Sequence, residues 1–208
     1  MSGEPNSESP DPSKPSGETG AYSQQIQHSP VGARLPDRVA PGVFSTGVIV
    51  MEGPEEFVLD FVQRLQRPPR LAIRVILSPN VMSRFVAALK DNLQRFEQVF
   101  GPPKALPQPP HLERRPSIQE IYQELRLPDE LLSGVYANTV MVGHSPAEFF
   151  FDFITRFFPT AAVSARVYMA ASQVPQMLVA LTTSLQNRLN RGPEARREPP
   201  PAPEREEQ

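Results

Sequence analysis

Apolar residues in this chain occur as short alternating runs followed by a longer stripe at helical spacing. The run Val43–Met51 alternates imperfectly, which is typical of a strand with both faces partly covered. Two further runs, Glu56–Leu65 and Leu71–Ser78, predict two more strands. The side of the third strand that we expect to face inward holds Leu71, Ile73, Val75 and Leu77.

A helix is expected to follow these three strands. Ser78 and Pro79 supply an N-cap and a first-turn proline, and Gly101 followed by two prolines ends the pattern. Its apolar stripe recurs three and four positions apart and consists of Met82, Phe85, Val86, Leu89, Leu93, Phe96 and Phe100.

This pattern of three strands and a helix occurs twice. The segment GVFSTGVIVM from Gly42 is matched without a gap by GVYANTVMVG from Gly134, about 92 residues later. Each copy has about 60 residues, a size at which a single core is only marginally stable. We therefore expect an α+β fold of two tandem β-β-β-α repeats packed as an intramolecular pseudo-dimer. In it, antiparallel sheets are covered by amphipathic helices, and the N- and C-terminal tails are disordered.

Composition sets the expected boundaries, because all 12 Phe lie inside the two repeats while most prolines lie outside them. We expect a disordered tail over 1–40, repeats over 41–101 and 131–192, a Pro-rich linker with a short helix over 102–130, and a second disordered tail over 193–208. The side of the linker helix that we expect to pack on the second repeat holds Ile118, Ile121, Tyr122 and Leu125.

Two pairs of opposite charges are the first candidate site. Asp60 and Arg74 are nearly equidistant from the centre of a predicted loop, and Asp152 and Arg166 repeat this arrangement. In a hairpin such residues lie opposite or diagonal on one outer face, as a cross-strand ion pair. An exposed pair contributes only about 0.2–1 kcal/mol, so the retained charges indicate a role in strand register or in binding.

The second candidate site is apolar. The run Glu148–Phe158, which contains the second strand of the second copy, is apolar on both sides. Such a strand is either central in a covered sheet or part of an interface. Phe150, Phe157 and Phe158 are therefore the candidate apolar interface.

Composition argues against several classes of function. The formal net charge of -2 provides no strong field for nucleic acid or an anionic membrane. Cysteine is absent, which excludes disulfides and thiolate chemistry and fits a cytoplasmic location. No apolar run is long enough to span a membrane, and the N-terminal segment lacks the pattern of a signal peptide.

Enzymatic chemistry also finds little support. His28, His111 and His144 fall in a tail, a linker and a turn, without metal-ligand spacing. Glu56 and Glu148 recur beside a turn, where a local hydrogen bond is the expected role and a functional carboxylate is the alternative. We expect no catalytic, cofactor-binding or metal site.

A family resemblance rests on residues divided between the two copies. Its opening pattern is in the second copy, as Tyr136, Asn138, Ser145, Pro146, Glu148 and Phe149. Its closing pattern is in the first copy, as Ser78, Pro79, Asn92, Leu93, Phe96, Glu97, Phe100 and Gly101. The chain resembles family 3467 of the domains of unknown function (DUF 3467), a small bacterial domain, present as two diverged tandem copies. The resemblance implies no activity.

Two classes of function remain open. The first is a non-enzymatic interaction module that engages protein partners; its strand meander and long helix are broadly similar to the export chaperone SecB. The alternative is single-stranded nucleic-acid binding on a sheet face. The candidate arginines for it are Arg64, Arg67, Arg70, Arg74, Arg156 and Arg166. A homo-oligomer is compatible with either class.

Overall fold

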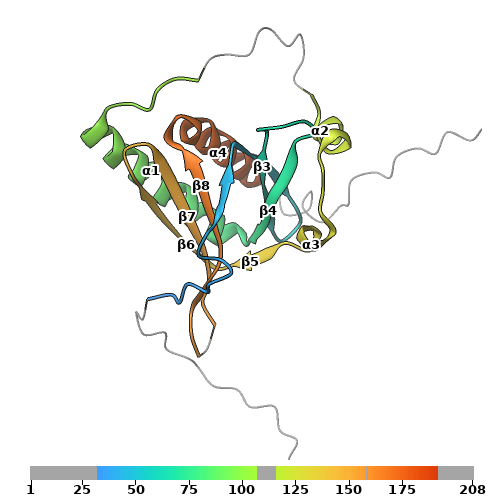
Figure 1. The fold of residues 1–208 in the computed structure, drawn as a ribbon, viewed down its shortest axis with the longest axis horizontal. Coiled ribbons are helices and arrows are strands. Elements are labelled where there is room, and N and C mark those ends of the chain that lie inside the picture. Colours follow the sequence, from blue (N-terminus) through green and yellow to red (C-terminus); the bar gives the residue numbers. More distant parts are fainter. Residues whose placement is uncertain (1–31, 107–115, 158, 192–208) are drawn as a thin grey trace, which may run out of the picture.

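The computed structural model describes residues 32–106, 116–157 and 159–191, and it shows two interlocked copies of one unit (Figure 1). The first copy contains β1 (Val43–Ser45), β2 (Gly47–Glu52), β3 (Phe57–Gln63), β4 (Arg70–Leu77) and α1 (Pro79–Phe100). The connecting segment contains α2 (Ile118–Glu124) and α3 (Asp129–Leu132). The second copy contains β5 (Val135–Ala137), β6 (Thr139–His144), β7 (Glu148–Thr155), β8 (Ala162–Ala170), a 3-10 turn (Ala171–Gln173) and α4 (Val174–Asn190).

The predicted first strand of each copy is divided into two short strands. The break falls at Thr46 in the first copy and at Asn138 in the second. The Thr46 hydroxyl accepts a hydrogen bond from the Arg64 backbone N–H at 2.9 Å, and the Asn138 side-chain oxygen accepts one from Arg156 at 2.8 Å. These side chains hold the break in place, so the halves of the strand enter different sheets.

Strand exchange between the copies builds both sheets. One sheet has the order β1-β8-β7-β6 and the other β2-β3-β4-β5. Within each sheet three strands from one copy pair antiparallel, and the short strand from the other copy pairs parallel at one edge. The α+β prediction of two repeats is confirmed, but the sheets are mixed where purely antiparallel sheets were expected.

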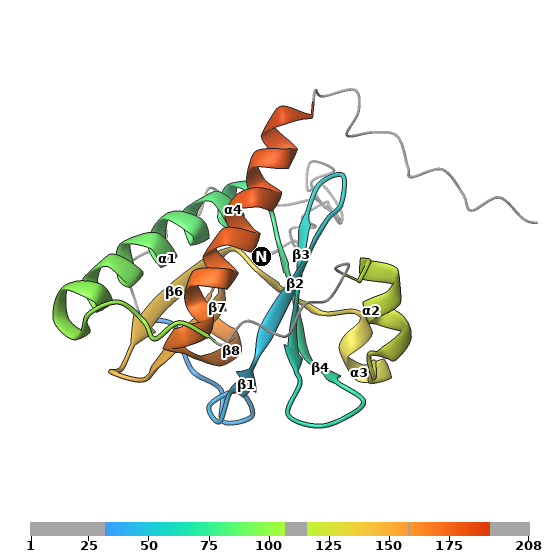
Figure 2. The ribbon, with the colours of Figure 1, turned by 90° about the horizontal axis from the view of Figure 1, so that it is seen from above.

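The helices cross between copies as well. Helix α1 packs against β6 of the second copy, α4 packs against β2 of the first, and the two helices contact each other. Figure 2 shows both helices together on one side of the sheets. Each copy therefore covers the sheet that the other copy supplies.

The core joins the two copies through aromatic contacts. The ring of Phe61 lies 6.5 Å from that of Phe151 and 5.6 Å from that of Phe153, between centroids. Phe85 lies 5.7 and 5.6 Å from the same two rings. All four side chains are buried and belong to one apolar cluster that spans both copies. The predicted pseudo-dimer is confirmed.

One inward-facing residue of the third predicted strand was placed wrongly. The pairing of β3 with β4 shifts between Phe61 and Val62, so Ile73 pairs with Phe61 while Leu71 pairs with Val62. This bulge turns Leu71 to the opposite face, where it joins a second apolar cluster with Ile49.

That second cluster also corrects the position expected for the linker helix. Helix α2 packs on the sheet built mainly from the first copy, because its following residue Leu125 joins Ile49, Val62 and Leu71. Ser117 and Glu120 form a capping box that starts the helix. Figure 2 shows α2 and α3 on the opposite side of β3 and β4 from α1 and α4.

Ordered structure begins upstream of the boundary expected at residue 41. Arg34 forms a parallel bridge with Ala162, as Arg126 does with Arg70, and each bridge lies beside the end of a sheet. The sequence Arg-Leu-Pro-Asp occurs at both places, from Arg34 and from Arg126. The repeat therefore includes these motifs. The tails expected to be disordered lie outside the described residues over 1–31 and 192–208, as does linker segment 107–115.

Candidate binding face

The first charge pair lies directly across two strands, as predicted. Asp60 pairs with Arg74 in the register of β3 and β4. The Arg74 guanidinium donates from Nε to Oδ1 at 2.8 Å and from Nη2 to Oδ2 at 2.7 Å. The carboxylate is fully buried, so the pair differs from an exposed surface pair of small effect.

The second pair repeats this geometry. Arg166 donates from Nε and Nη2 to the two carboxylate oxygens of Asp152, at 2.6 and 2.7 Å. Hydrogen bonding to its aspartate raises the pKa of each arginine above its ordinary value. Both guanidinium groups are therefore cations committed to a buried carboxylate.

The two pairs differ in what lies above them. The Tyr122 hydroxyl of α2 donates to Asp60 Oδ2, and it also lies 3.4 Å from the sulfur of Met51. Arg74 further donates to the backbone oxygen of Leu132 at 2.9 Å. Burial, and then the bond to Asp60, raise the pKa of Tyr122. We call this outer side of the sheet β2-β3-β4-β5 the covered face.

The outer side of the sheet β1-β8-β7-β6 has no such helix among the described residues. We call it the open face. Its side chains alternate with the buried residues of the same strands and include Phe44, Met141, Phe150, Arg166 and Tyr168. Met141 is 48% exposed, whereas Ile49, its equivalent on the covered face, is 6% exposed.

Aromatic rings form a row across the open face. Phe44 pairs with Tyr168, and Tyr168 pairs with Phe150, on three adjacent strands. The Phe150 ring lies over Gly143, where an added Cβ would clash with the ring. The Arg166 guanidinium carbon is 5.8 Å from the centroid of the Phe150 ring, within the range of a cation–π contact.

The opening on this face is local. Ile154 and Val163, which lie on the same outer side, are buried. They are the equivalents of Val62 and Leu71 in the first copy. In each sheet these two residues lie at the end where an Arg-Leu-Pro-Asp motif forms a bridge with the sheet. The exposed part of the open face is therefore the part that α2 occupies on the covered face.

The predicted apolar interface is not brought together. Phe150 lies on the open face, whereas Phe157 stacks on Tyr136 of the other sheet, with centroids 6.2 Å apart and planes 5° apart. Phe158 lies outside the described residues. The prediction missed Met141 and Tyr168, although alternation with neighbouring buried residues was the available signal.

His144 and Glu148 make contacts within the fold. His144 packs on Phe96 with centroids 5.6 Å apart, and at the equivalent place Arg188 lies 3.5 Å from Glu52. One half thus has an aromatic contact where the other has an ion pair. In the second turn, Glu148 accepts a hydrogen bond from Ser145 at 2.7 Å.

Among the described residues no group of three or more His, Cys, Asp or Glu side chains is placed to hold a metal ion. His28 and His111 lie outside the described residues. No helix in the described part of the chain has both the length and the apolar character needed to cross a membrane.

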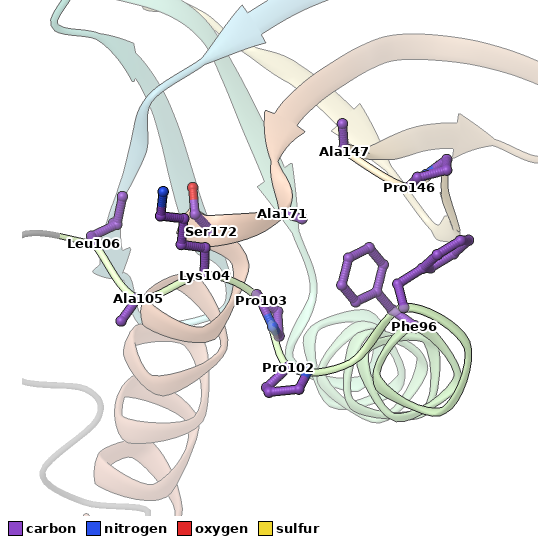
Figure 3. Close-up of a pocket in the computed structure, with 11 residues that line it drawn as sticks. Phe96, Pro102, Pro103, Lys104, Ala105, Leu106, Pro146, Ala147, Ala171 and Ser172 are labelled. Atoms are coloured by element: carbon purple, nitrogen blue, oxygen red, sulfur yellow. The ribbon is translucent and has the colours of Figure 1, made fainter.

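A cleft of about 580 Å³ lies at the C-terminal end of α1 (Figure 3). Phe96, Phe100 and the prolines that follow α1 line one side, and the β6–β7 turn and the residues after β8 line the other. Lys104 and Ser172 are the polar side chains in this lining. The other residues that line the cleft are phenylalanine, proline, alanine and leucine.

Comparisons with known proteins identify the domain that is repeated. The pattern of a family described as "Protein of unknown function (DUF3467)" matches residues 8–105 and again residues 104–190. No curated protein matches the chain. No solved structure matches it either.

Proposed function

Because the chain belongs to the DUF3467 family, with two tandem copies joined in one core, we propose that it is a non-enzymatic module that binds a protein partner through the open face. The observation that carries the proposal is the exposure of Met141, 48% against 6% for its equivalent Ile49. A large apolar side chain left exposed where the repeat elsewhere buries one is typical of an interaction site.

The ionisable residues of the repeat support binding over catalysis. In both pairs, Asp60 with Arg74 and Asp152 with Arg166, two hydrogen bonds join the guanidinium to the carboxylate. A catalytic acid or base must reach a substrate proton, and a buried carboxylate bound to a guanidinium does not. Their role is to hold the register of the strands beneath the face.

A photo-crosslinking experiment tests the proposal. Benzoylphenylalanine at position 141 in the full chain is irradiated in extracts of the native host, beside a matched probe at Val179, which is 66% exposed on α4. We expect one protein, or a small reproducible set, to be captured from position 141 alone. Capture of the same set from both positions, or of none, contradicts the proposal.

The aromatic row favours a second candidate, the binding of single-stranded nucleic acid. Phe44, Tyr168 and Phe150 lie side by side, and bases stack on exposed aromatic rings of sheets. Arg74 and Arg166, however, are neutralised by their aspartates. The test is oligonucleotide binding in a salt series: affinity in the micromolar range with a steep salt dependence supports it, and no binding below about 100 μM opposes it.

A further inference from the structure

The internal repeat shows what covers an open face of this kind. On the covered face, helix α2 lies over the position of Ile49 and contributes Ile121 and Tyr122 to the apolar cluster there, with Leu125 directly after it. Met141 occupies the position of Ile49 on the open face and remains half exposed. The strands beneath the two faces pair in the same register, so Met141 and Ile49 occupy equivalent places on them. An apolar side chain at either place is shielded from water only when another element packs over it.

The chain's own residues at the equivalent sequence positions are poorly suited to provide this cover. In the register of the repeat, the anchors Ile121, Tyr122 and Leu125 correspond to Ser29, Pro30 and Ala33. The serine and the alanine contribute little apolar area, and proline is disfavoured inside a helix. In this gap-free register, the positions equivalent to the three anchors of α2 therefore carry no large apolar side chain.

The surface of the open face fits a helix better than an extended strand. Strands β7 and β8 lie inside the sheet, so their backbone groups are already paired on both sides. A ligand that lies across β7 and β8, beside Met141 on the edge strand β6, therefore binds there through side chains. An amphipathic helix presents apolar side chains three and four positions apart for that purpose. Met141 is unbranched and adapts to varied apolar surfaces.

We propose that the open face binds an amphipathic helix of a partner protein, seated over Met141 and Phe150 as α2 is seated over Ile49 on the covered face. This inference rests on the proposed function and specifies its partner. The partner helix carries two large apolar or aromatic residues in adjacent positions and a third one turn later, the pattern of Ile121, Tyr122 and Leu125. The helix that the chain already contains is therefore a template for its ligand.

A synthetic peptide with the sequence of residues 116–133 is the probe. It is labelled and titrated against the full-length protein, with fluorescence anisotropy as the readout. We expect saturable binding that Met141→Arg weakens by about tenfold or more, since a cation then lies in the centre of an apolar contact. The matched variant Val179→Arg, on α4, is expected to bind as the wild type does. Equal affinity for Met141→Arg and wild type, or no saturable binding, overturns the proposal.

A peptide control separates sequence-specific docking from nonspecific binding. The same peptide with Ile121→Ala and Tyr122→Ala keeps the capping box and the charges but loses two anchors. We expect it to bind at least about tenfold more weakly. Equal binding of both peptides overturns the proposal.

A photo-probe at position 141 distinguishes the other occupants. In the purified full-length protein it is expected to crosslink to the added peptide. Crosslinking within the chain to residues 1–31 would make the chain's own N-terminal segment the occupant, and a crosslinked dimer would make it a second copy; either result overturns the proposal. If a partner from host extract were captured at position 141 through a non-helical segment, the proposal of a helical ligand would be wrong. The proposed function, binding of a protein partner at the open face, would still stand.

Discussion

Replacement of Phe151 by alanine tests whether the two copies unfold as one unit. Phe151 belongs to the second copy, is fully buried, and packs against Phe61 and Phe85 of the first copy. Removing a buried phenylalanine side chain lowers the free energy of unfolding by about 3–5 kcal/mol. With a urea dependence of about 2 kcal/mol per molar, the unfolding midpoint should fall by about 2 M.

The assay follows backbone amides of β3, in the first copy, and of β7, in the second, across a urea series by NMR. Because the core is shared, we expect both sets to lose their native signals at the same lowered midpoint. The exposed control Val179→Ala on α4 should change stability by less than about 0.5 kcal/mol. A wild-type midpoint for β3 beside a lowered one for β7 would refute the shared core.

Three further predictions concern single contacts. Tyr122→Phe removes the hydroxyl that donates to Asp60 and should cost about 1–3 kcal/mol in thermal or urea unfolding. Because the pKa of Tyr122 is raised in the folded state, the contribution of this tyrosine to the free energy of unfolding is complete below about pH 10 and is lost as the pH rises further. Above that pH the wild type should lose stability faster than Tyr122→Phe. An equal dependence of stability on pH in the two proteins would contradict this. Arg188→Phe should cost about 2–4 kcal/mol, because its hydrogen bonds to two turn carbonyls are lost and the partly buried Glu52 loses one of its two cations. Adding Glu52→His should recover part of that loss, and a double-mutant cycle without coupling would contradict the equivalence with Phe96 and His144. Gly134→Ala should cost about 1–3 kcal/mol, because φ is 67° there and the added Cβ would lie 2.7 Å from an arginine side chain of β4; an unchanged melting temperature would argue against this turn geometry.

The local elements of this fold were predictable because their patterns are local. Alternating runs gave the strands around Asp60 and Asp152, and the spacing of Phe85, Leu89 and Phe96 gave α1. The repeat itself indicated a shared core, since a single copy has too little apolar surface to be stable alone. The opposition of Asp60 and Arg74 followed from counting residues to the loop.

The exchange of strands between copies was not predictable in the same way. Alternation shows that Val43–Ser45 is extended, but it does not show which strand pairs with it. The break at Thr46 depends on a hydrogen bond to a residue at the end of another strand. The position of α2 depends on which sheet leaves apolar area uncovered. The bulge at Val62 contributes to that area, because it turns Leu71 to the face on which α2 packs. The Arg-Leu-Pro-Asp motif, which occurs from both Arg34 and Arg126, is the signal in the sequence that extends the repeat upstream.

The candidate site shows a similar division between local and tertiary information. The charge pairs were found from sequence because both copies carry them at one spacing. The contrast between a covered and an open face was not found, because exposure of Met141 depends on where a distant helix docks. Periodicity assigns a side chain to one side of a strand, and only tertiary structure says what lies above that side.

Complementation of separated halves tests the exchange of strands and helices most directly. Fragments 32–106 and 116–191 are prepared separately and examined by circular dichroism and NMR, alone and mixed at equal concentration. We expect neither fragment alone to show a cooperative unfolding transition, because each lacks the strand and helix that complete its sheet. The mixture should form a one-to-one complex with dispersed amide signals and a single transition. Cooperative folding of either fragment alone, with no change on mixing, would contradict the interlocked fold.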